Sequence, residues 1–233
     1  LVDEAERSMA GLVSAIEAET GRRVASSVVV GNLLEAVIER AARADLLVVG
    51  ARGQHPVRDF AIGTTGERLL RKRRGSMLVT RRKPVSSYRR VLAPVDFSKH
   101  SARVLRQATS IAPAAQIDVL HAFEVPFESK LRFAGVADDE IHRLRQHARA
   151  QAVDSVARLV AEAGVDAARV RRRVEHGYAP RVIVDAAREA DADLIVIGKH
   201  GESIVEDLLL GSVTLHVLGE ARCDVLVVST AQP

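Results

Sequence analysis

The sequence predicts an α/β protein made of two copies of one module, in which helices cover both faces of a parallel, doubly wound sheet. Three observations lead to this prediction. A ladder of short apolar runs and glycines recurs along the chain at a fixed spacing. The apolar runs are continuous rather than alternating, as in strands that are buried on both faces. Strand-like and helix-like segments alternate, which is the pattern of a parallel sheet with helical connections.

Equivalent residues of the two copies lie 148 positions apart. Residues 46–50 match residues 194–198, and residues 77–80 match residues 225–228. Apolar residues recur at most positions of both stretches, and the first stretch ends in a glycine in each copy, whereas a single shared glycine would mean little. The recurrence therefore indicates one structural unit that is present twice.

A change of composition marks the boundary between the copies. Residues 84–89 combine Pro84 with two serines between apolar segments, which is typical of a linker. A new strand-like run begins at Val91. We therefore assign residues 1–83 to a first domain and residues 90–233 to a second.

The second copy supplies every element of the module. Its five predicted strands lie at residues 90–95, 117–122, 168–175, 194–197 and 225–228. The first helix is expected to be capped by Ser98. A long second helix runs from Asp138 with an apolar face at helical spacing and stops at Gly164. Gly177 precedes the third helix, and Ser212 begins the fourth.

The first copy is expected to start at the module's long helix, over residues 3–20. Its predicted strands lie at residues 24–30, 46–49 and 77–80. The first strand, first helix and second strand of the module are absent, so this domain is truncated at its N-terminus. We expect either roughly 50 further residues before Leu1 in the natural protein, or low stability of this copy in isolation.

The composition restricts the class of protein. The chain is 47% hydrophobic, but no apolar stretch approaches the roughly 20 residues that span a bilayer. Only 3% of the residues are aromatic, so the core must be aliphatic. A single cysteine, Cys223, cannot form an internal disulfide, which indicates a reducing compartment such as the cytoplasm.

The net charge of +4 arises from bunched basic runs, chiefly residues 71–74 and 171–173. We interpret these runs as solvated surface, with a weak anion-binding surface as the alternative. No aromatic residues alternate with them, so the pattern disfavours nucleic-acid binding.

A glycine-rich motif follows the fourth strand of each copy. It reads Gly-x-x-Gly, nine residues, then Gly-Ser/Thr, and comprises Gly50, Gly53, Gly63 and Thr64 in the first copy and Gly198, Gly201, Gly211 and Ser212 in the second. Glycine lets the backbone approach a ligand closely. The last glycine and the hydroxyl residue lie at a helix N-terminus, where free N–H groups and the helix dipole favour an anion. The motif predicts a phosphate cradle, and a structural glycine turn with a serine cap is the alternative.

The motif differs from two familiar phosphate loops. A Walker loop needs Gly-Lys-Ser/Thr at its own spacing. The dinucleotide fingerprint follows the first strand of its sheet rather than the fourth.

The glycine motif, the strand Val-Leu-Ala-Pro-Val-Asp over residues 91–96 and the run Leu-His-Ala over residues 120–122 resemble the universal stress protein family, in its tandem-domain, ATP-binding branch. The resemblance implies two Rossmann-like domains of the adenine nucleotide alpha hydrolase type. It implies a cytoplasmic protein of the stress response that binds ATP, with Mg²⁺ held by the phosphates. Pairing of the two domains within the chain, and a homodimer, are also implied.

The same resemblance assigns roles to residues. Asp96 is expected near the adenosine, and the main chain of Ala122 is expected to hold adenine. Ribose and phosphates are assigned to Gly198, Gly201, Gly211, Ser212 and Val213, while Gly50, Gly53, Gly63 and Thr64 match the same cradle in the first copy, without its adenine-side strands. Acidic residues of the second copy's motif, Glu202, Glu206 and Asp207, would repel a triphosphate unless they point outward, and Lys199 and His200 offset them.

We expect a nucleotide-binding regulatory protein rather than an enzyme. No general base or metal-binding carboxylate cluster is evident, so we assign no catalytic residue and no metal ligand. His142 and His147 lie five apart rather than four, and Ser212 has no evident base. The alternatives are a nucleotide-free interaction scaffold and a weak ATPase. Three phenylalanines after the second strand, Phe123, Phe127 and Phe133, are interpreted as a cap on the core, or else as a partner surface or lid.

Overall fold

The computed structural model describes residues 2–51, 63–81, 83, 86–200 and 210–229. The chain forms two compact units, residues 1–40 and residues 41–233. Each unit is described by itself below.

The first unit consists of the helix α1 (Val2–Thr20), an extended segment and most of the helix α2 (Leu33–Ala41). The helix predicted over residues 3–20 is therefore confirmed. α2 begins where the side-chain oxygen of Asn32 accepts hydrogen bonds from the backbone N–H groups of Leu34 and Glu35. No residue of α1 is buried.

The strand predicted over residues 24–30 is wrong, because these residues form no strand. In the second copy the equivalent strand, β5 (Val170–His176), is paired along its whole length with β4 (Gln116–Phe123). Among the described residues, no strand pairs with residues 24–30. A run of β-branched residues forms a strand only where a neighbouring strand can pair with its backbone.

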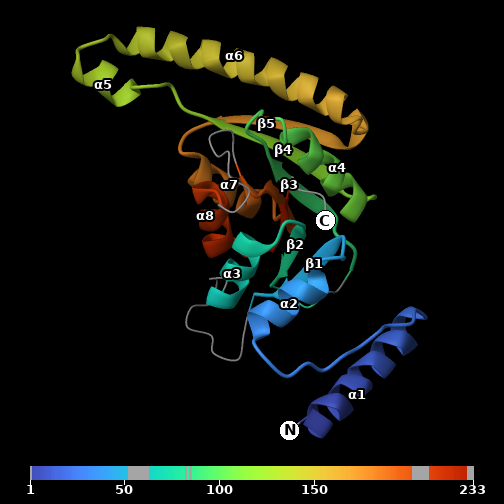
Figure 1. Ribbon diagram of the computed structural model, residues 1–233. Helices are drawn as coiled ribbons and strands as arrows, with labels where there is room; N and C mark the ends of the chain where they lie inside the picture. The colour runs from blue at the N-terminus through green and yellow to red at the C-terminus, as the bar shows by residue number, and fades with distance from the viewer. Residues whose placement is uncertain (1, 52–62, 82, 84–85, 201–209, 230–233) are drawn as a thin grey trace. The chain divides into compact units, whose positions relative to one another are not determined.

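A seven-stranded sheet forms the centre of the second unit (Figure 1). Its strands lie side by side in the order β1-β2-β7-β6-β3-β4-β5. The remaining strands are β1 (Leu46–Gly50), β2 (Ser76–Thr80), β3 (Arg90–Pro94), β6 (Leu194–Gly198) and β7 (Asp224–Val228). Every neighbouring pair is parallel except β2 and β7. The predicted α/β fold with a mostly parallel sheet is confirmed.

The antiparallel pair joins the two strands that the sequence repeat makes equivalent. Leu78 pairs with Leu226, and these two residues lie 148 positions apart in the sequence. On either side, Met77 pairs with Val227 and Val79 with Val225. The register is therefore locally two-fold symmetric about the two leucines, which are both buried.

Helices cover both faces of this sheet (Figure 1). α4 (Ser101–Ile111) and α6 (Asp138–Ala163) pack on one face, where they share a core cluster with β3, β4 and β6. α3 (Thr64–Lys72), α7 (Ala179–Glu189) and α8 (Ser212–Glu220) lie on the other. A short helix, α5 (Glu128–Phe133), precedes α6, and a 3-10 turn (Ala167–Arg169) precedes β5.

The core is aliphatic, as the composition predicted. The central strands β3 and β6 bury consecutive residues, including Leu92, Ala93, Ile195 and Val196, all of which are 0% exposed. α6 ends at Gly164, whose φ of +67° lies in the left-handed region that glycine adopts without strain. The predicted helix stop is confirmed.

Candidate functional site

The candidate site lies where β3, β4 and β6 reach their carboxyl ends. In the sheet, β3 lies between β4 and β6. The chain continues from β3 to β4 and β5 on one side and later returns to β6 on the other side, so the order of strands reverses at β3. In doubly wound sheets a crevice opens at such a switch point, outside the carboxyl ends of the strands. A cavity of about 170 Å³ occupies this place, and residues from Pro94 to Asp96 and from Ile197 to Gly198 line it.

The cavity gathers most of the residues that the sequence assigned to the second site. Its lining includes Asp96, Ala122, Gly198, Gly211, Ser212 and Val213. Gly201 lies outside the described residues. Further lining residues that the sequence did not single out for the cavity are Ser101, His121, Ile183 and Thr214.

Asp96 is held in place by the start of α4. Its Oδ1 accepts hydrogen bonds from the backbone N–H of Ser98 at 3.1 Å and from the hydroxyl of Ser101 at 2.9 Å. The prediction that Ser98 caps the helix is wrong, because His100 is the N-cap residue and makes no side-chain cap. The carboxylate of Asp96 accepts the hydrogen bonds of this turn instead. The same hydrogen bonds hold the Asp96 side chain at the cavity.

The main chain of Ala122 faces the cavity side of β4. Leu120 accepts a hydrogen bond from the N–H of Val95 at 2.9 Å, so its carbonyl points toward β3. Main-chain groups of alternate residues point to the same side of a strand, and those of Ala122 therefore point the same way. β3 ends at Pro94, so the backbone of Ala122 lies beyond it. In this position the N–H can donate a hydrogen bond to the edge of a planar base, and the C=O can accept one from it.

His121 reinforces this end of the strand. Its Nδ1 lies 2.9 Å from the carbonyl oxygen of Val95. The ring of Phe97 lies against the imidazole, with 4.1 Å between the ring centroids. Phe97 has a φ of +62°, an uncommon conformation for a residue with a side chain. Ring contact and hydrogen bond together fix the turn that follows β3.

The glycine-rich side of the cavity depends on close approach of backbones. A Cβ on Gly198 would lie 3.2 Å from the carbonyl oxygen of His200, and one on Gly211 would lie 3.4 Å from that of Lys199. The N–H of Gly211 donates to the same Lys199 oxygen at 3.0 Å. The hydroxyl of Thr214 donates to the carbonyl of Gly198 at 2.8 Å. A side chain at Gly198 would therefore force the carbonyl of His200 to shift, whereas the Cβ of a side chain at Gly211 would lie in van der Waals contact with Lys199.

The start of α8 lacks a side-chain cap. Gly211 is the N-cap residue, and Ser212 is the first helical residue. The alternative of a serine cap therefore does not describe this helix. N–H groups of the first turn have no partner within the helix and carry its positive dipole end. These N–H groups can donate hydrogen bonds to an anion at the rim of the cavity.

The first copy repeats the start of the helix. Gly63 is the N-cap of α3, with φ and ψ of −62° and 159°, against −62° and 145° for Gly211. No atom of the described residues lies within 4 Å of a Cβ built on Gly63. Gly50 ends β1 and Thr64 begins α3, but neither they nor Gly63 line the cavity of the second copy. Gly53 lies outside the described residues.

Lys199 takes a position that the sequence did not predict. Its side chain is only 2% exposed. The Nζ donates hydrogen bonds to the carbonyl oxygens of Arg71 at 3.2 Å and Arg73 at 3.0 Å, at the end of α3. The ammonium group is therefore bonded to backbone of the first copy. Only a long-range contact could have revealed this role.

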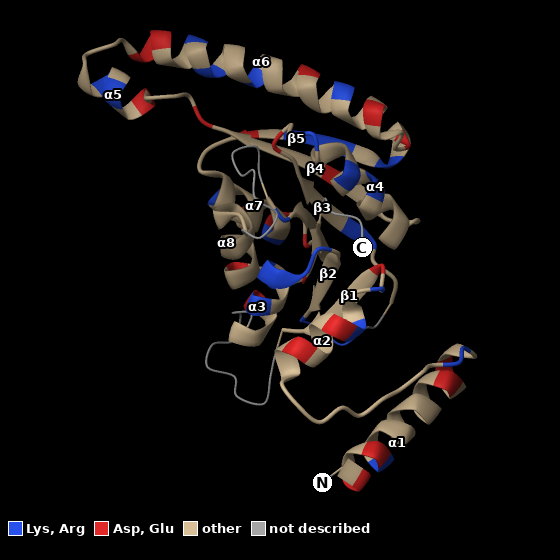
Figure 2. Ribbon diagram, viewed as in Figure 1, with Lys and Arg blue, Asp and Glu red and all other residues tan. Residues whose placement is uncertain are grey.

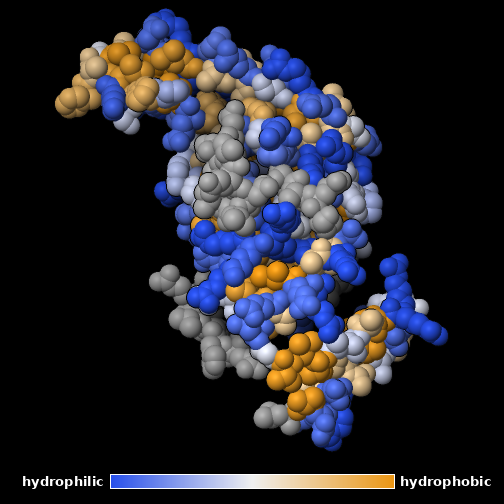
Figure 3. Space-filling view, in the orientation of Figure 1, coloured by the Kyte–Doolittle hydropathy of each residue, from blue (hydrophilic) through white to orange (hydrophobic). Residues whose placement is uncertain are grey.

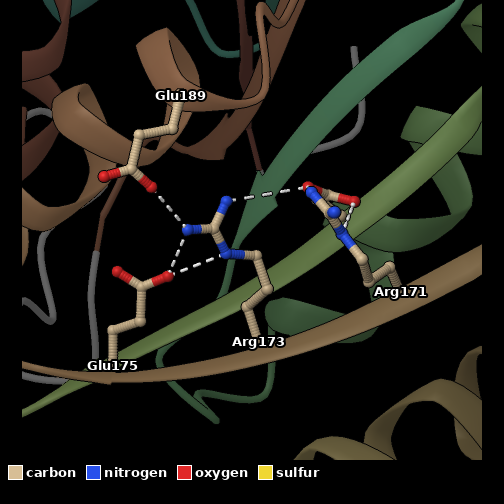
Figure 4. Close-up of polar contacts among 5 residues, drawn as sticks. Arg171, Arg173, Glu175 and Glu189 are labelled. Atoms are coloured by element: carbon tan, nitrogen blue, oxygen red, sulfur yellow. Dashed lines mark hydrogen bonds and ion pairs between the residues drawn. The ribbon is translucent and has the colours of Figure 1, made fainter.

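Figure 2 shows Lys and Arg residues along β5 and α3, and Figure 4 shows the polar contacts of two of these residues, Arg171 and Arg173. Arg171 pairs with Asp118, and Arg173 contacts Glu189 at 3.0 Å and the Oε1 of Glu175 at 2.7 Å from its Nε. The hydrogen bond with Asp118 is the main cause that raises the pKa of Arg171 above its ordinary value. In the described residues, neither guanidinium offers an unpaired charge for an anion.

Other candidates have structural explanations. The part of the chain that the structure describes holds no group of three or more His, Cys, Asp or Glu residues that could bind a metal. Cys223 is buried. Phe123 is buried in the core, whereas Phe127 and Phe133 are exposed, and Figure 3 shows hydrophobic side chains over α5. No helix among the described residues is long and apolar enough to cross a membrane.

Known proteins resemble the chain in both sequence and fold. Residues 87–229 match the model of the "Universal stress protein family". Universal stress protein A homolog 1 of Coxiella burnetii is 31% identical over 144 residues, which are 60% of this chain and 96% of the relative. A universal stress protein of Mycobacterium tuberculosis is 31% identical over 146 residues, which are 63% of this chain and 99% of the relative.

Solved structures extend the likeness in fold to nearly the whole chain. A universal stress protein from Archaeoglobus fulgidus has a TM-score of 0.69 at 19% identity, and the match covers 99% of this chain and 77% of that one. A functionally unknown protein from Pseudomonas aeruginosa PAO1 has a TM-score of 0.69 at 20% identity, over 96% and 77% of the two chains. Through the match over residues 87–229, this chain belongs to the universal stress protein family.

Proposed function

We propose that the second copy binds an adenine nucleotide, ATP, in the cavity at the carboxyl ends of β3, β4 and β6. One observation carries the proposal. An acidic residue after β3, the main chain at the end of β4, two glycines packed against neighbouring backbone and a helix start without a side-chain cap line a single cavity. The sequence motifs that assigned these residues lie as far apart as Asp96 and Val213, so their meeting in one place is not a consequence of local structure.

The size of the cavity suggests how the nucleotide divides over it. Pockets that enclose drug-sized ligands measure roughly 300–1,000 Å³, and this cavity measures about 170 Å³. We infer that base and ribose enter the cavity, with Asp96 near the ribose and Ala122 near adenine. The phosphates would extend to the start of α8, where Ser212 is exposed. Mg²⁺ would enter with ATP, bound to its phosphates.

The proposed role is regulation of the stress response in the cytoplasm. Membership of the universal stress protein family supports the role in stress. ATP would favour one conformation or assembly by binding it more tightly than the alternative.

We also propose that residues 1–83 and 90–233 are two domains that pair within the chain, joined by a linker at residues 84–89. The symmetric pairing of β2 with β7 supports this division. Equivalent strands of two related domains meet in this way when the domains are arranged like the subunits of a two-fold dimer.

A matched pair of glycine variants tests the site. In Gly211→Val the Cβ lies 3.4 Å from the carbonyl oxygen of Lys199 and 3.7 Å from the Cα of His200, so we expect the two methyl groups beyond it to crowd the start of α8. In Gly63→Val the Cβ meets no described atom within 4 Å at the same point of the first copy. Isothermal titration calorimetry with ATP is expected to show binding by the wild type and by Gly63→Val, and at least a tenfold loss in Gly211→Val. A GTP titration in parallel tests the preference for adenine.

Two outcomes would contradict the proposal. A wild-type protein that binds no adenine nucleotide at millimolar concentration would favour an interaction scaffold. Equal losses in the two valine variants would place the binding elsewhere.

A further inference from the structure

The antiparallel pairing of β2 with β7 brings the end of α3 to the proposed nucleotide site. β2 starts at the sheet edge where β7 ends, and the N–H of Ser229 donates to the hydroxyl of Ser76 at 3.3 Å. α3 directly precedes β2. Its last carbonyls therefore lie at the same edge as the carboxyl end of β6, from which the glycine-rich motif departs.

Lys199 connects these two elements through its side chain and its main chain. The side chain donates from Nζ to Arg71 and Arg73 of the first copy. The main-chain carbonyl accepts from Gly211, the N-cap of α8. One residue thus joins the C-terminus of α3 to the N-terminus of α8, where the phosphates are proposed to bind.

The contact is favourable at both ends. The last carbonyls of a helix have no partner within it and carry a partial negative charge, so an ammonium group there is stabilising. Burying an ammonium costs free energy unless its donors are satisfied, and the two carbonyls satisfy donors of Lys199. The carbonyl ends are fixed in turn, because Arg73 is buried and hydrogen-bonds to the carbonyls of Ala44 and Ser76.

The first copy lacks the reciprocal contact. The residue 148 positions before Lys199 is Ala51. Its N–H donates to Thr80 at 2.8 Å, as that of Lys199 donates to Val228 at 2.8 Å, so the two backbones have the same setting. An alanine side chain cannot reach the opposite helix. Between these two equivalent positions, the side-chain contact therefore runs only from the second copy to the first.

We propose that Lys199 is a positioning residue that couples the first copy to the phosphate end of the second copy's site. The inference rests on the proposed function. In the first copy, the end of α3 anchors Lys199, and Lys199 sets the distance between the strand end at Gly198 and the helix start at Gly211. The bound phosphates and the end of α3 thus stabilise one arrangement of the same residue.

The test is a titration of the full chain with ATP and with adenosine, in the wild type, Lys199→Met and Lys199→Arg. Methionine keeps most of the length of the side chain but donates no hydrogen bond, and arginine restores donors. We expect Lys199→Met to lose at least tenfold in ATP affinity with adenosine affinity changed less than twofold, and Lys199→Arg to recover part of the loss. The loss should persist at high salt, because hydrogen-bonded positioning is screened far less than attraction between exposed charges.

Hydrogen exchange supplies the second measurement. ATP is expected to slow amide exchange in the last turn of α3 in the wild type and to leave it unchanged in Lys199→Met.

Each contrary result has a separate meaning. Equal losses for ATP and adenosine, or a change in melting temperature alone, would overturn the proposal in favour of a purely structural lysine. A loss that vanishes at high salt, without an effect of ATP on α3, would overturn it in favour of a direct charge contact with phosphate. If the wild type binds neither ligand, the proposed function itself fails.

Discussion

Gly63 and Gly211 begin equivalent helices with nearly the same backbone angles, but they lie in different surroundings. Gly211 lines a cavity and is packed against Lys199 and His200, whereas a Cβ at Gly63 would meet no described atom within 4 Å. Further walls of the cavity come from β3, β4 and α4. The comparison shows that the glycine motif forms a helix start in both copies, while in the second copy its described residues also line a cavity together with these neighbours.

The two long helices, α1 and α6, also end alike but differ in their surroundings. α1 and α6 each end at a glycine in the left-handed conformation, Gly21 at φ +66° and Gly164 at φ +67°. Five residues before these glycines lie Ile16, 42% exposed, and Leu159, 7% exposed. α6 packs on α4 and β5, while α1 buries no residue. Local signals thus end both helices alike, and tertiary packing decides which one contributes to a core.

The largest expected effect tests this pair of helices. Leu159→Ala is expected to lower the free energy of unfolding by roughly 2–5 kcal/mol, the range for a large side chain removed from a core. Ile16→Ala should change it by less than about 0.5 kcal/mol, as for surface positions. Urea denaturation followed by circular dichroism measures both. Equal costs would mean that α1 is packed as α6 is.

A smaller effect concerns the equivalent strand starts at Ser76 and Asp224. Asp224 accepts hydrogen bonds from the hydroxyl of Tyr88 at 2.7 Å and from the N–H of Arg81 at 2.7 Å. Ser76, its counterpart in the first copy, carries no charge. Burial raises the pKa of Tyr88 above its ordinary value of 10.0, and the hydrogen bond to Asp224 raises it further.

The sign of the pH dependence follows from this shift. Between the ordinary pKa and the raised one, the folded protein keeps a proton that the unfolded chain has lost. The contribution to stability is therefore complete below about pH 10 and declines as the pH rises toward the raised pKa. Urea denaturation between pH 9 and pH 11 should show a steeper decline for the wild type than for Tyr88→Phe. The exposed Tyr178 supplies the control, and a Tyr178→Phe variant with the same altered slope would refute the assignment.

Much of the second copy could be predicted because its signals are local. Apolar runs marked its strands, and Gly164 marked the end of α6. The strand at residues 24–30 could not be judged locally, because its formation depends on a neighbouring strand. The helix cap assigned to Ser98 failed for a related reason, since Asp96, two residues earlier, satisfies the same turn.

Long-range contacts account for the rest. The direction in which β2 meets β7 depends on how the two copies pack, and no residue pattern of either strand specifies it. The position of Lys199 follows from that pairing. The six candidate residues of the second copy that the structure describes all line the cavity, since the order of strands in a doubly wound sheet brings their carboxyl ends together.

The most direct test of the account is ATP binding by Ser212→Glu and its first-copy counterpart Thr64→Glu, measured by calorimetry. A carboxylate in the first turn of a helix stabilises the helix, so both variants should fold. In Ser212→Glu the new charge lies where the phosphates are proposed to bind, and we expect at least a tenfold loss of ATP affinity. Thr64→Glu should bind ATP as the wild type does. A Ser212→Glu protein that binds ATP as tightly as Thr64→Glu would contradict the proposed site.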